Sequence, residues 1–154
     1  MLAFGSRMFP TRLEYNAGLD NAPGDPFGRT ELAIDADGSA TLVHKRMGQT
    51  KRWTAKVDAT TLAAAWAALV KGGWPTVPQH PIPGGSAMRT LIAHTAEGTQ
   101  RGDVAWNGAK NLDGYNEAFP ILDSIVRQIS QDTVKATPNT LPPVVTDIVC
   151  ETTN

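Results

Sequence analysis

The chain has 154 residues, 41% of them hydrophobic and 19% charged, which are ordinary proportions for a globular protein. This length is enough for one domain with a sizeable core, and the composition excludes a disordered or collagen-like chain. The 14 lysines and arginines nearly balance the 15 aspartates and glutamates, so a formal net charge of −1 gives no overall attraction to nucleic acid or anionic lipid.

Cysteine usage and the start of the chain indicate the compartment. The single cysteine, Cys150, cannot form an intramolecular disulfide, which favours a reducing environment. Residues 1–7 contain neither a basic leader nor an apolar run of secretory length, and no later stretch approaches the roughly 20 apolar residues of a membrane span. We therefore expect a cytoplasmic protein with no membrane partner.

Alternation of apolar and polar residues predicts strands in the first third of the chain. Leu13 and Tyr15 alternate with charged residues over 11–15, and residues 29–35 alternate in the same way after a loop over 16–28 that contains Gly and Pro.

A hairpin turn follows at Asp37-Gly38, because glycine supplies the positive φ that such tight turns require. Residues 40–47 form the second arm of this hairpin. A third arm over 52–57, after Gly48-Gln49, completes an antiparallel meander.

The period then changes from two residues to about 3.6, which predicts an amphipathic helix. Asp58 or Thr60 can serve as its N-cap, and Gly72-Gly73 ends it. Its apolar stripe consists of Leu62, Ala65, Trp66, Leu69 and Val70.

Beyond this helix, the proline-rich residues 74–85 predict an extended connector. A second hairpin follows, with arms over 88–96 and 99–106 around Glu97-Gly98. The last predicted helix carries the stripe Phe119, Leu122 and Val126. Because proline lacks a backbone donor, we expect Pro120 to be its first residue, after an entry turn over 115–119.

These elements predict one α+β domain over residues 1–130. It should contain an antiparallel sheet of about five strands, in two hairpin units, with the two amphipathic helices packed on one face. Residues 131–154 are rich in Thr and Pro, which predicts a C-terminal tail that contributes at most one edge strand, over 144–150.

The sequence contains no recognised pattern for catalysis, a metal or a cofactor. His44, His80 and His94 lack the close His, Cys or Glu spacing of a zinc site, and Gly84-Gly85-Ser86 lacks the glycine that follows a nucleophilic serine. No glycine-rich phosphate loop occurs. We therefore expect no catalytic residues, no metal, no cofactor and a non-enzymatic protein.

Two features indicate a binding surface instead. Cations cluster around the turn between the second and third arms, at what we call the basic hairpin tip: His44, Lys45, Arg46, Lys51 and Arg52. Such a cluster can meet an acidic protein surface or phosphates, although a solvated strand face explains it equally well. In the connector, we expect Trp74 to line an apolar surface groove together with Pro75 and Pro78, whereas Trp53, Trp66 and Trp106 fit buried faces.

The order of these elements resembles that of small bacterial proteins that include the emfourin-type inhibitors of thermolysin-like metalloproteases. The shared pattern is an Asp-Gly hairpin, an L-x-x-x-W-x-x-L helix, an apolar exit with proline, a second hairpin and a closing helix. It is carried here by residues 34–47, 62–78, 88–106 and 115–129. The resemblance implies a non-catalytic protein that blocks a partner enzyme, and it transfers no inhibitory residue.

We therefore expect a protein-binding protein that inhibits or neutralises a partner enzyme, of the toxin-immunity or protease-inhibitor type. One alternative is a nucleic-acid accessory module that uses Lys45, Arg46, Lys51 and Arg52. A second is an enzyme whose site is assembled from distant residues, such as His94 with Asp103 or Glu117. The sequence does not determine the oligomeric state.

Overall fold

The computed structural model describes residues 9–18, 28–46, 48–82, 87–134 and 138–153. The elements in chain order are β1 (Arg12–Gly18), β2 (Arg29–Asp35), β3 (Ser39–Arg46), β4 (Gln49–Val57), α2 (Ala59–Lys71), β5 (Met88–Thr95), β6 (Gly98–Ala105), the 3₁₀ turn η1 (Ala109–Asn111), α3 (Tyr115–Ile129) and β7 (Val145–Thr153).

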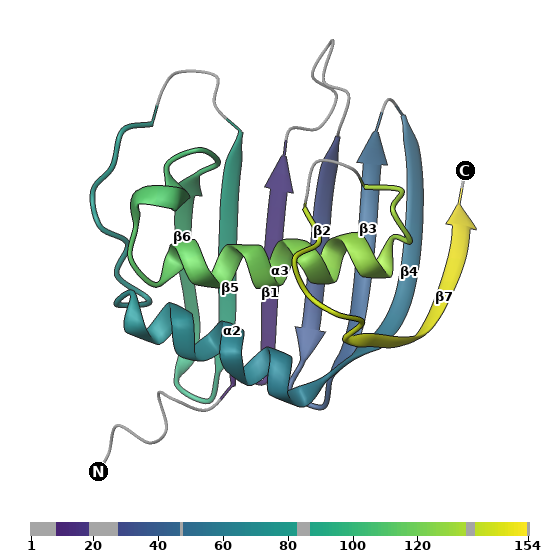
Figure 1. Ribbon diagram of the computed structural model, residues 1–154, viewed down its shortest axis with the longest axis horizontal. Coiled ribbons are helices and arrows are strands. Elements are labelled where there is room, and N and C mark those ends of the chain that lie inside the picture. The colour runs from purple at the N-terminus through teal and green to yellow at the C-terminus, as the bar shows by residue number, and fades with distance from the viewer. Residues whose placement is uncertain (1–8, 19–27, 47, 83–86, 135–137, 154) are drawn as a thin grey trace.

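The strands form one antiparallel sheet in the order β6-β5-β1-β2-β3-β4-β7, which confirms the α+β class. The sheet has seven strands, so the expected number of about five is too low. β1 is the third strand of the sheet and joins the two predicted hairpin units, because it pairs with both β2 and β5 (Figure 1).

The C-terminal tail is part of the same sheet. The optional edge strand is present as β7, which pairs with β4 from Val57↔Val145 to Thr50↔Thr153. α3 also holds the segment that leads to β7: the Ser124 hydroxyl accepts from the Thr140 amide at 2.9 Å, and the Gln128 side chain accepts from the Val144 amide at 2.9 Å. These contacts connect the described part of residues 131–154 to the sheet and to α3.

The predicted turn and the first helix are confirmed in detail. Gly38 adopts φ 93° in the β2–β3 turn, where the Asp37 carboxylate accepts from the Ser39 amide at 2.8 Å. Asp58 caps α2 by accepting from the Thr61 amide at 3.2 Å. The predicted stripe of α2 faces the sheet, and Leu62, Ala65, Trp66 and Leu69 are buried.

The second helix starts earlier than predicted. α3 begins at Tyr115, so Pro120 lies inside the helix instead of at its start. This is tolerated because proline this close to the N-terminus removes the donor to a single carbonyl, that of the exposed Asn116. Gly114 permits the early start: a Cβ there would lie 2.4 Å from the Gly72 amide nitrogen at the end of α2.

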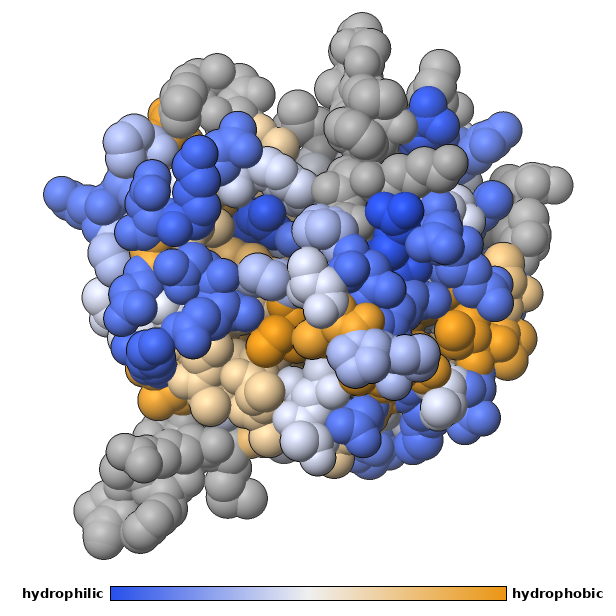
Figure 2. All heavy atoms as spheres, viewed as in Figure 1, coloured by the Kyte–Doolittle hydropathy of each residue, from blue (hydrophilic) through white to orange (hydrophobic). Residues whose placement is uncertain are grey.

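Both helices cover the same face of the sheet, as expected (Figure 1). The side chains of that face form the core with the two helical stripes, and the largest fully buried ones on the strands include Tyr15, Leu32, Leu42, Trp53 and Leu91. The outer side of the helix layer is mostly hydrophilic, with hydrophobic residues visible in a band between polar ones (Figure 2). Within the described ranges, no helix is both long and apolar enough to cross a bilayer.

The opposite face of the sheet, which we call the open face, has no helix over it among the described elements. Its side chains alternate with the buried ones and are half-buried along the central strands. Neighbouring strands place Ile92, Glu14, Ala33, Thr41 and Thr54 in one row across this face.

Candidate functional site

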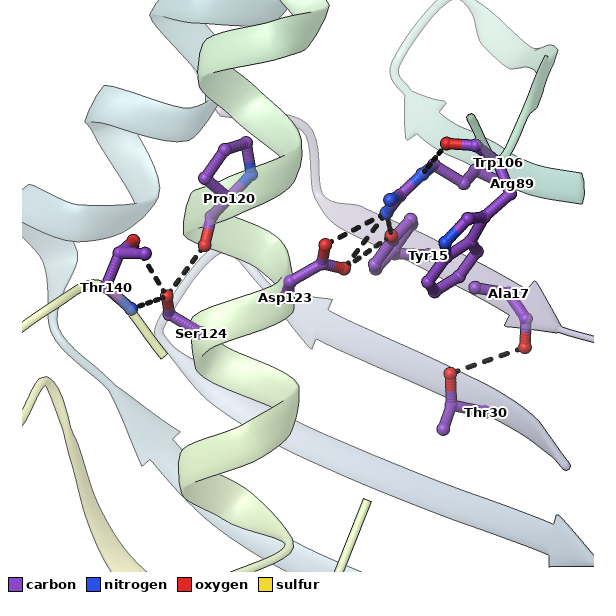
Figure 3. A network of polar contacts seen from close by, with 9 residues as sticks. All are labelled: Tyr15, Ala17, Thr30, Arg89, Trp106, Pro120, Asp123, Ser124 and Thr140. Carbon is purple, nitrogen blue, oxygen red and sulfur yellow. Dashed lines mark hydrogen bonds and ion pairs between the residues drawn. The ribbon is translucent and has the colours of Figure 1, made fainter. Parts of the chain in front are cut away.

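A buried polar network joins β1, β5 and α3 on the helix-covered side (Figure 3). The Tyr15 hydroxyl donates to Asp123 Oδ1 at 2.7 Å. Arg89 Nη1 donates to both Asp123 oxygens, at 3.1 and 3.0 Å, and also to the Tyr15 hydroxyl. The side chains of Arg89 and Asp123 are 9% and 4% exposed, so this ion pair lies almost entirely outside bulk water.

The guanidinium of Arg89 is also fixed by two aromatic rings. Its Cζ lies 3.9 Å from the ring centre of Trp106 and 4.8 Å from that of Phe119. Its Nε donates to the Trp106 carbonyl oxygen at 3.3 Å. A cation held by ring faces, a carbonyl and a carboxylate has one geometry available to it, so the network is rigid.

Burial shifts the pKa values of the ionisable groups in this network. It raises the pKa of the Asp123 carboxyl, and the charge of Arg89 opposes that shift. It also raises the pKa of the Tyr15 hydroxyl well above the usual value, an effect that Asp123 strengthens. For Arg89, burial acts to lower the pKa, but Tyr15 and Asp123 outweigh it and the pKa is raised, so the guanidinium stays charged.

A cavity of 470 Å³ opens next to this network. Its walls come from β5, from the η1 region, from the first half of α3 and from Pro138. Arg89 and Asp123 are part of its lining, and so are the rings of Trp106 and Phe119. A rigid buried cation beside a cavity of this size is a candidate ligand site.

Sequence reasoning missed this site, although a signal was present. Arg89 has the same strand parity as the buried Leu91 and Ala93, so a charge at that position has to find a buried partner. Asp123 directly follows the core residue Leu122 on α3. Both residues interrupt apolar patterns, which is the signature of a buried ion pair.

The predicted basic hairpin tip is split between the two faces of the sheet. Lys45 and Arg52 are on the open face, where Lys45 contacts Glu31 at 3.5 Å and Arg52 contacts Glu151 at 3.6 Å. His44 is on the other face and is 7% exposed, so it does not join Lys45 and Arg52 at the surface.

The rest of the tip follows the same division. Lys51 is cross-strand partner to His44, and the exposed Arg46 pairs with Gln49 next to the turn. The five residues therefore do not form one cationic patch.

The predicted groove around Trp74 is also different in the structure. Trp74 is only 8% exposed, because its ring packs edge-on against Trp66 at 6.5 Å and fits over Gly102, where a Cβ would lie 2.8 Å from the ring. Its indole donates to Gln100 Oε1 at 3.0 Å. Pro75 and Pro78 stay exposed, so the expected apolar groove lacks its aromatic wall.

A hollow of 570 Å³ does lie between the connector and β6, and His80 and Asp103 both line it. The two side chains are occupied elsewhere. His80 Nε2 accepts from the Ala105 amide at 3.0 Å, so its Nδ1 carries the proton and donates to the Pro78 carbonyl at 2.9 Å. Asp103 accepts from the Thr90 hydroxyl at 2.6 Å.

The dispersed residues considered for an enzyme site do not meet. His94 lies on the open face, where its Nε2 is 2.5 Å from a Glu14 oxygen. Asp103 is on the same face but four register positions away, about 13 Å along the strands. Glu117 is on α3, on the opposite side of the sheet, and pairs with Lys71 at 2.7 Å.

Among the described residues, no three His, Cys, Asp or Glu side chains are grouped so that they could hold a metal ion. No family model, curated protein or solved structure matches this chain. Any assignment of function therefore has to come from the surfaces and the cavity themselves.

Proposed function

We propose that the protein binds an acidic partner protein through the open face of its sheet and thereby blocks that partner. The observation that carries this proposal is an entire sheet face without a helical cover, with side chains held in cross-strand contacts. Such a surface is ordered before binding, so little conformational entropy is lost when a partner docks.

Ion pairs give the open face its order. Arg12 contacts Asp35 at 2.9 Å across β1 and β2, and Arg52 contacts Glu151 across β4 and β7. Towards the middle, Glu14 meets His94 across β1 and β5. These contacts hold long side chains in place on a flat surface.

An excess of cations on β2 to β4 favours an acidic partner, because the open face of these strands carries Arg29, Lys45, Arg52 and Lys56 against the carboxylates of Glu31 and Asp35. Arg29 and Lys45 share a single carboxylate, that of Glu31, at 3.1 and 3.5 Å. Lys56 makes its hydrogen bonds to the Asp37 carbonyl and the Ser39 hydroxyl, both at 3.4 Å. Charge complementarity at these strands would speed association and select the partner.

The open face is also large enough for a stable complex. Seven strands spaced by about 4.8 Å, each rising about 3.3 Å per residue, give a surface of about 29 Å by 23 Å. The product is a projected area of about 670 Å², and stable interfaces bury about 800 Å² of accessible surface on each partner, so a partner would have to cover nearly the whole face.

The resemblance to emfourin-type inhibitors favours an enzyme or a toxin as the partner, and we place the interaction in the cytoplasm. Binding would inhibit by covering the partner's working surface, with no reaction on this chain. The basic hairpin tip contributes through Lys45 and Arg52, while the buried Trp74 and His44 have no contact role.

The first step of the test captures the partner by photo-crosslinking. A crosslinking amino acid at Thr41, in the middle of the open face, should trap an acidic protein in extract from the source organism. The same amino acid at Ala67, on the exposed side of α2, is the control and should not trap it.

The second step uses the purified partner. Lys45→Gln/Lys56→Gln should slow association about tenfold at low salt, whereas the matched Lys71→Gln/Lys110→Gln on the helix side should not. One equivalent of the wild-type protein should suppress the partner's activity. Capture from Ala67 alone, or equal association rates for both double variants, would refute the proposal.

The same material tests the nucleic-acid alternative. Binding to mixed-sequence DNA or RNA that weakens steeply with salt would show that the ligand of this face is a nucleic acid and not an acidic protein. We expect no such binding, because the cations of the basic hairpin tip are divided between the two faces of the sheet and do not line one groove for a phosphate backbone.

A further inference from the structure

Arg89 has hydrogen-bond donors that the fold does not use. Its Nε and Nη1 are engaged by Trp106, Tyr15 and Asp123, but Nη2 has no hydrogen-bond partner among the residues described. This nitrogen carries two N–H groups. The side chain is 9% exposed and also lines the adjacent cavity, from which an acceptor can reach these donors. Buried donors in folded proteins nearly always have an acceptor, so an acceptor is expected there.

The cavity supplies further donors around the same point. Asn107 and Asn116 line it with side-chain amides, and Lys110 contributes an ammonium group. Their amide and ammonium groups add donors to those of Arg89, and an anion needs such donors as partners.

The charge of the lining favours an anion with a single charge. Among the described lining residues, Arg89 and Lys110 are positive and Asp123 is the one carboxylate. That carboxylate already accepts hydrogen bonds from the Tyr15 hydroxyl and from Arg89 Nη1, so its negative charge is balanced within the network. One positive charge is left for a ligand.

The remaining lining favours a flat apolar group. Phe119, Pro120 and Pro138 contribute an aromatic ring and two pyrrolidine rings to the walls. The volume of 470 Å³ is in the usual range for small-molecule sites.

From these observations we propose that the cavity binds a small organic carboxylate, with its carboxylate against Arg89 and its flat apolar part between Phe119, Pro120 and Pro138. Arg89 and Asp123 lie between the sheet and α3 (Figure 3), on the side opposite the open face. The site is therefore independent of the proposed partner binding, and either proposal can fail alone.

Benzoate is a suitable probe because it combines both required groups. Titration is followed by NMR through the Trp106 indole N–H and the Arg89 Nε–H signals. We expect saturable shifts of both signals with a Kd on the order of 1 mM, as for a fragment of this size. Acetate, inorganic phosphate and benzyl alcohol each lack one required group and should bind at least tenfold more weakly.

Two variants test the location. Asn116→Trp fills the mouth of the cavity from an exposed helix position and should weaken benzoate binding at least tenfold, whereas the neighbouring Glu117→Gln should leave it unchanged. Arg89→Gln/Asp123→Asn removes both charges, with Asn matching Asp in size and Gln shorter than Arg, and if folded it should also lose binding.

The proposal is overturned by three results. One is the absence of saturable shifts at these signals. Another is binding of benzyl alcohol as tight as that of benzoate, which would show that Arg89 does not recognise charge. Equally tight binding of acetate or phosphate would show that the apolar walls do not contribute to binding. The third is unchanged benzoate binding in Asn116→Trp.

Discussion

The ion pair between Arg89 and Asp123 should be costly to break from one side and cheap to remove as a whole. Asp123→Ala leaves a guanidinium that is 9% exposed without its carboxylate, and it deprives the Tyr15 hydroxyl of its acceptor. Loss of one partner of a buried pair costs about 3 to 5 kcal/mol. For a chain of this length, that lowers the melting temperature by about 10 to 15 °C.

The whole network can instead be replaced by apolar side chains of similar size. The triple variant Tyr15→Phe/Arg89→Met/Asp123→Leu leaves none of the three polar groups behind. Because the desolvation cost of both charges is removed with them, its unfolding free energy should be closer to wild type than that of Asp123→Ala. Tyr15→Phe is included because its hydroxyl would otherwise be buried without a partner, at a cost of about 1 to 3 kcal/mol.

Urea unfolding measures these differences. Tryptophan fluorescence reports the transition, since Trp53, Trp66 and Trp74 are buried. The slope with denaturant should stay constant across the variants, so that shifts in midpoint reflect stability alone. If the triple variant loses as much stability as the sum of its single variants, the pair contributes independently of its desolvation and the reasoning is wrong.

Three other predictions concern the core, the tyrosines and the C-terminal segment. Trp66→Ala should lower the unfolding free energy by about 3 to 5 kcal/mol, because it empties the contact between α2 and the sheet; an unchanged urea midpoint would contradict the observed orientation of α2. Burial raises the pKa of Tyr15 and also that of Tyr115, the latter to about 12. An unfolded tyrosine ionises near pH 10, whereas these two stay protonated to higher pH in the folded chain. The unfolding free energy should therefore not be reduced by them below about pH 10, and above it should fall by up to about 1.4 kcal/mol per pH unit for each tyrosine. Ultraviolet absorbance should then show tyrosinate only as the chain unfolds, and its appearance in folded protein near pH 10 would exclude this. Ser124→Ala removes the acceptor of the Thr140 amide and should cost about 1 to 3 kcal/mol. Hydrogen exchange at β7 should become faster in that variant while exchange in β1 does not change.

Local patterns predicted the elements of this fold better than their pairing. The alternation around Leu13 and Tyr15 identified β1 as a strand, but nothing in that pattern indicates that it lies between β2 and β5. Its pairing with β5 joins residues such as Arg12 and His94, which are far apart in the chain. Such contacts depend on the whole core. The pattern of one segment therefore predicts that the segment is a strand, but does not predict which strands lie next to it.

The same limit explains the errors about the surface. Trp74 follows a helix-ending glycine pair and precedes a proline, which suggests an exposed connector. Its burial depends on Gly102, a residue on β6 whose missing side chain leaves room for the indole ring. The charges of the basic hairpin tip were misjudged for a related reason: their partners Glu31 and Glu151 come from β2 and β7, which the tip's own sequence does not reveal.

The connector after α2 has a consequence for how copies of this protein can associate. It runs along the outer side of β6 (Figure 1), and His80 occupies the Ala105 amide that an added strand would need. A strand that adds to this end of β6 would therefore have to displace His80 from the Ala105 amide, whereas β7 forms the other edge of the sheet. The connector thus protects one end of the β6 edge against edge-to-edge pairing between copies.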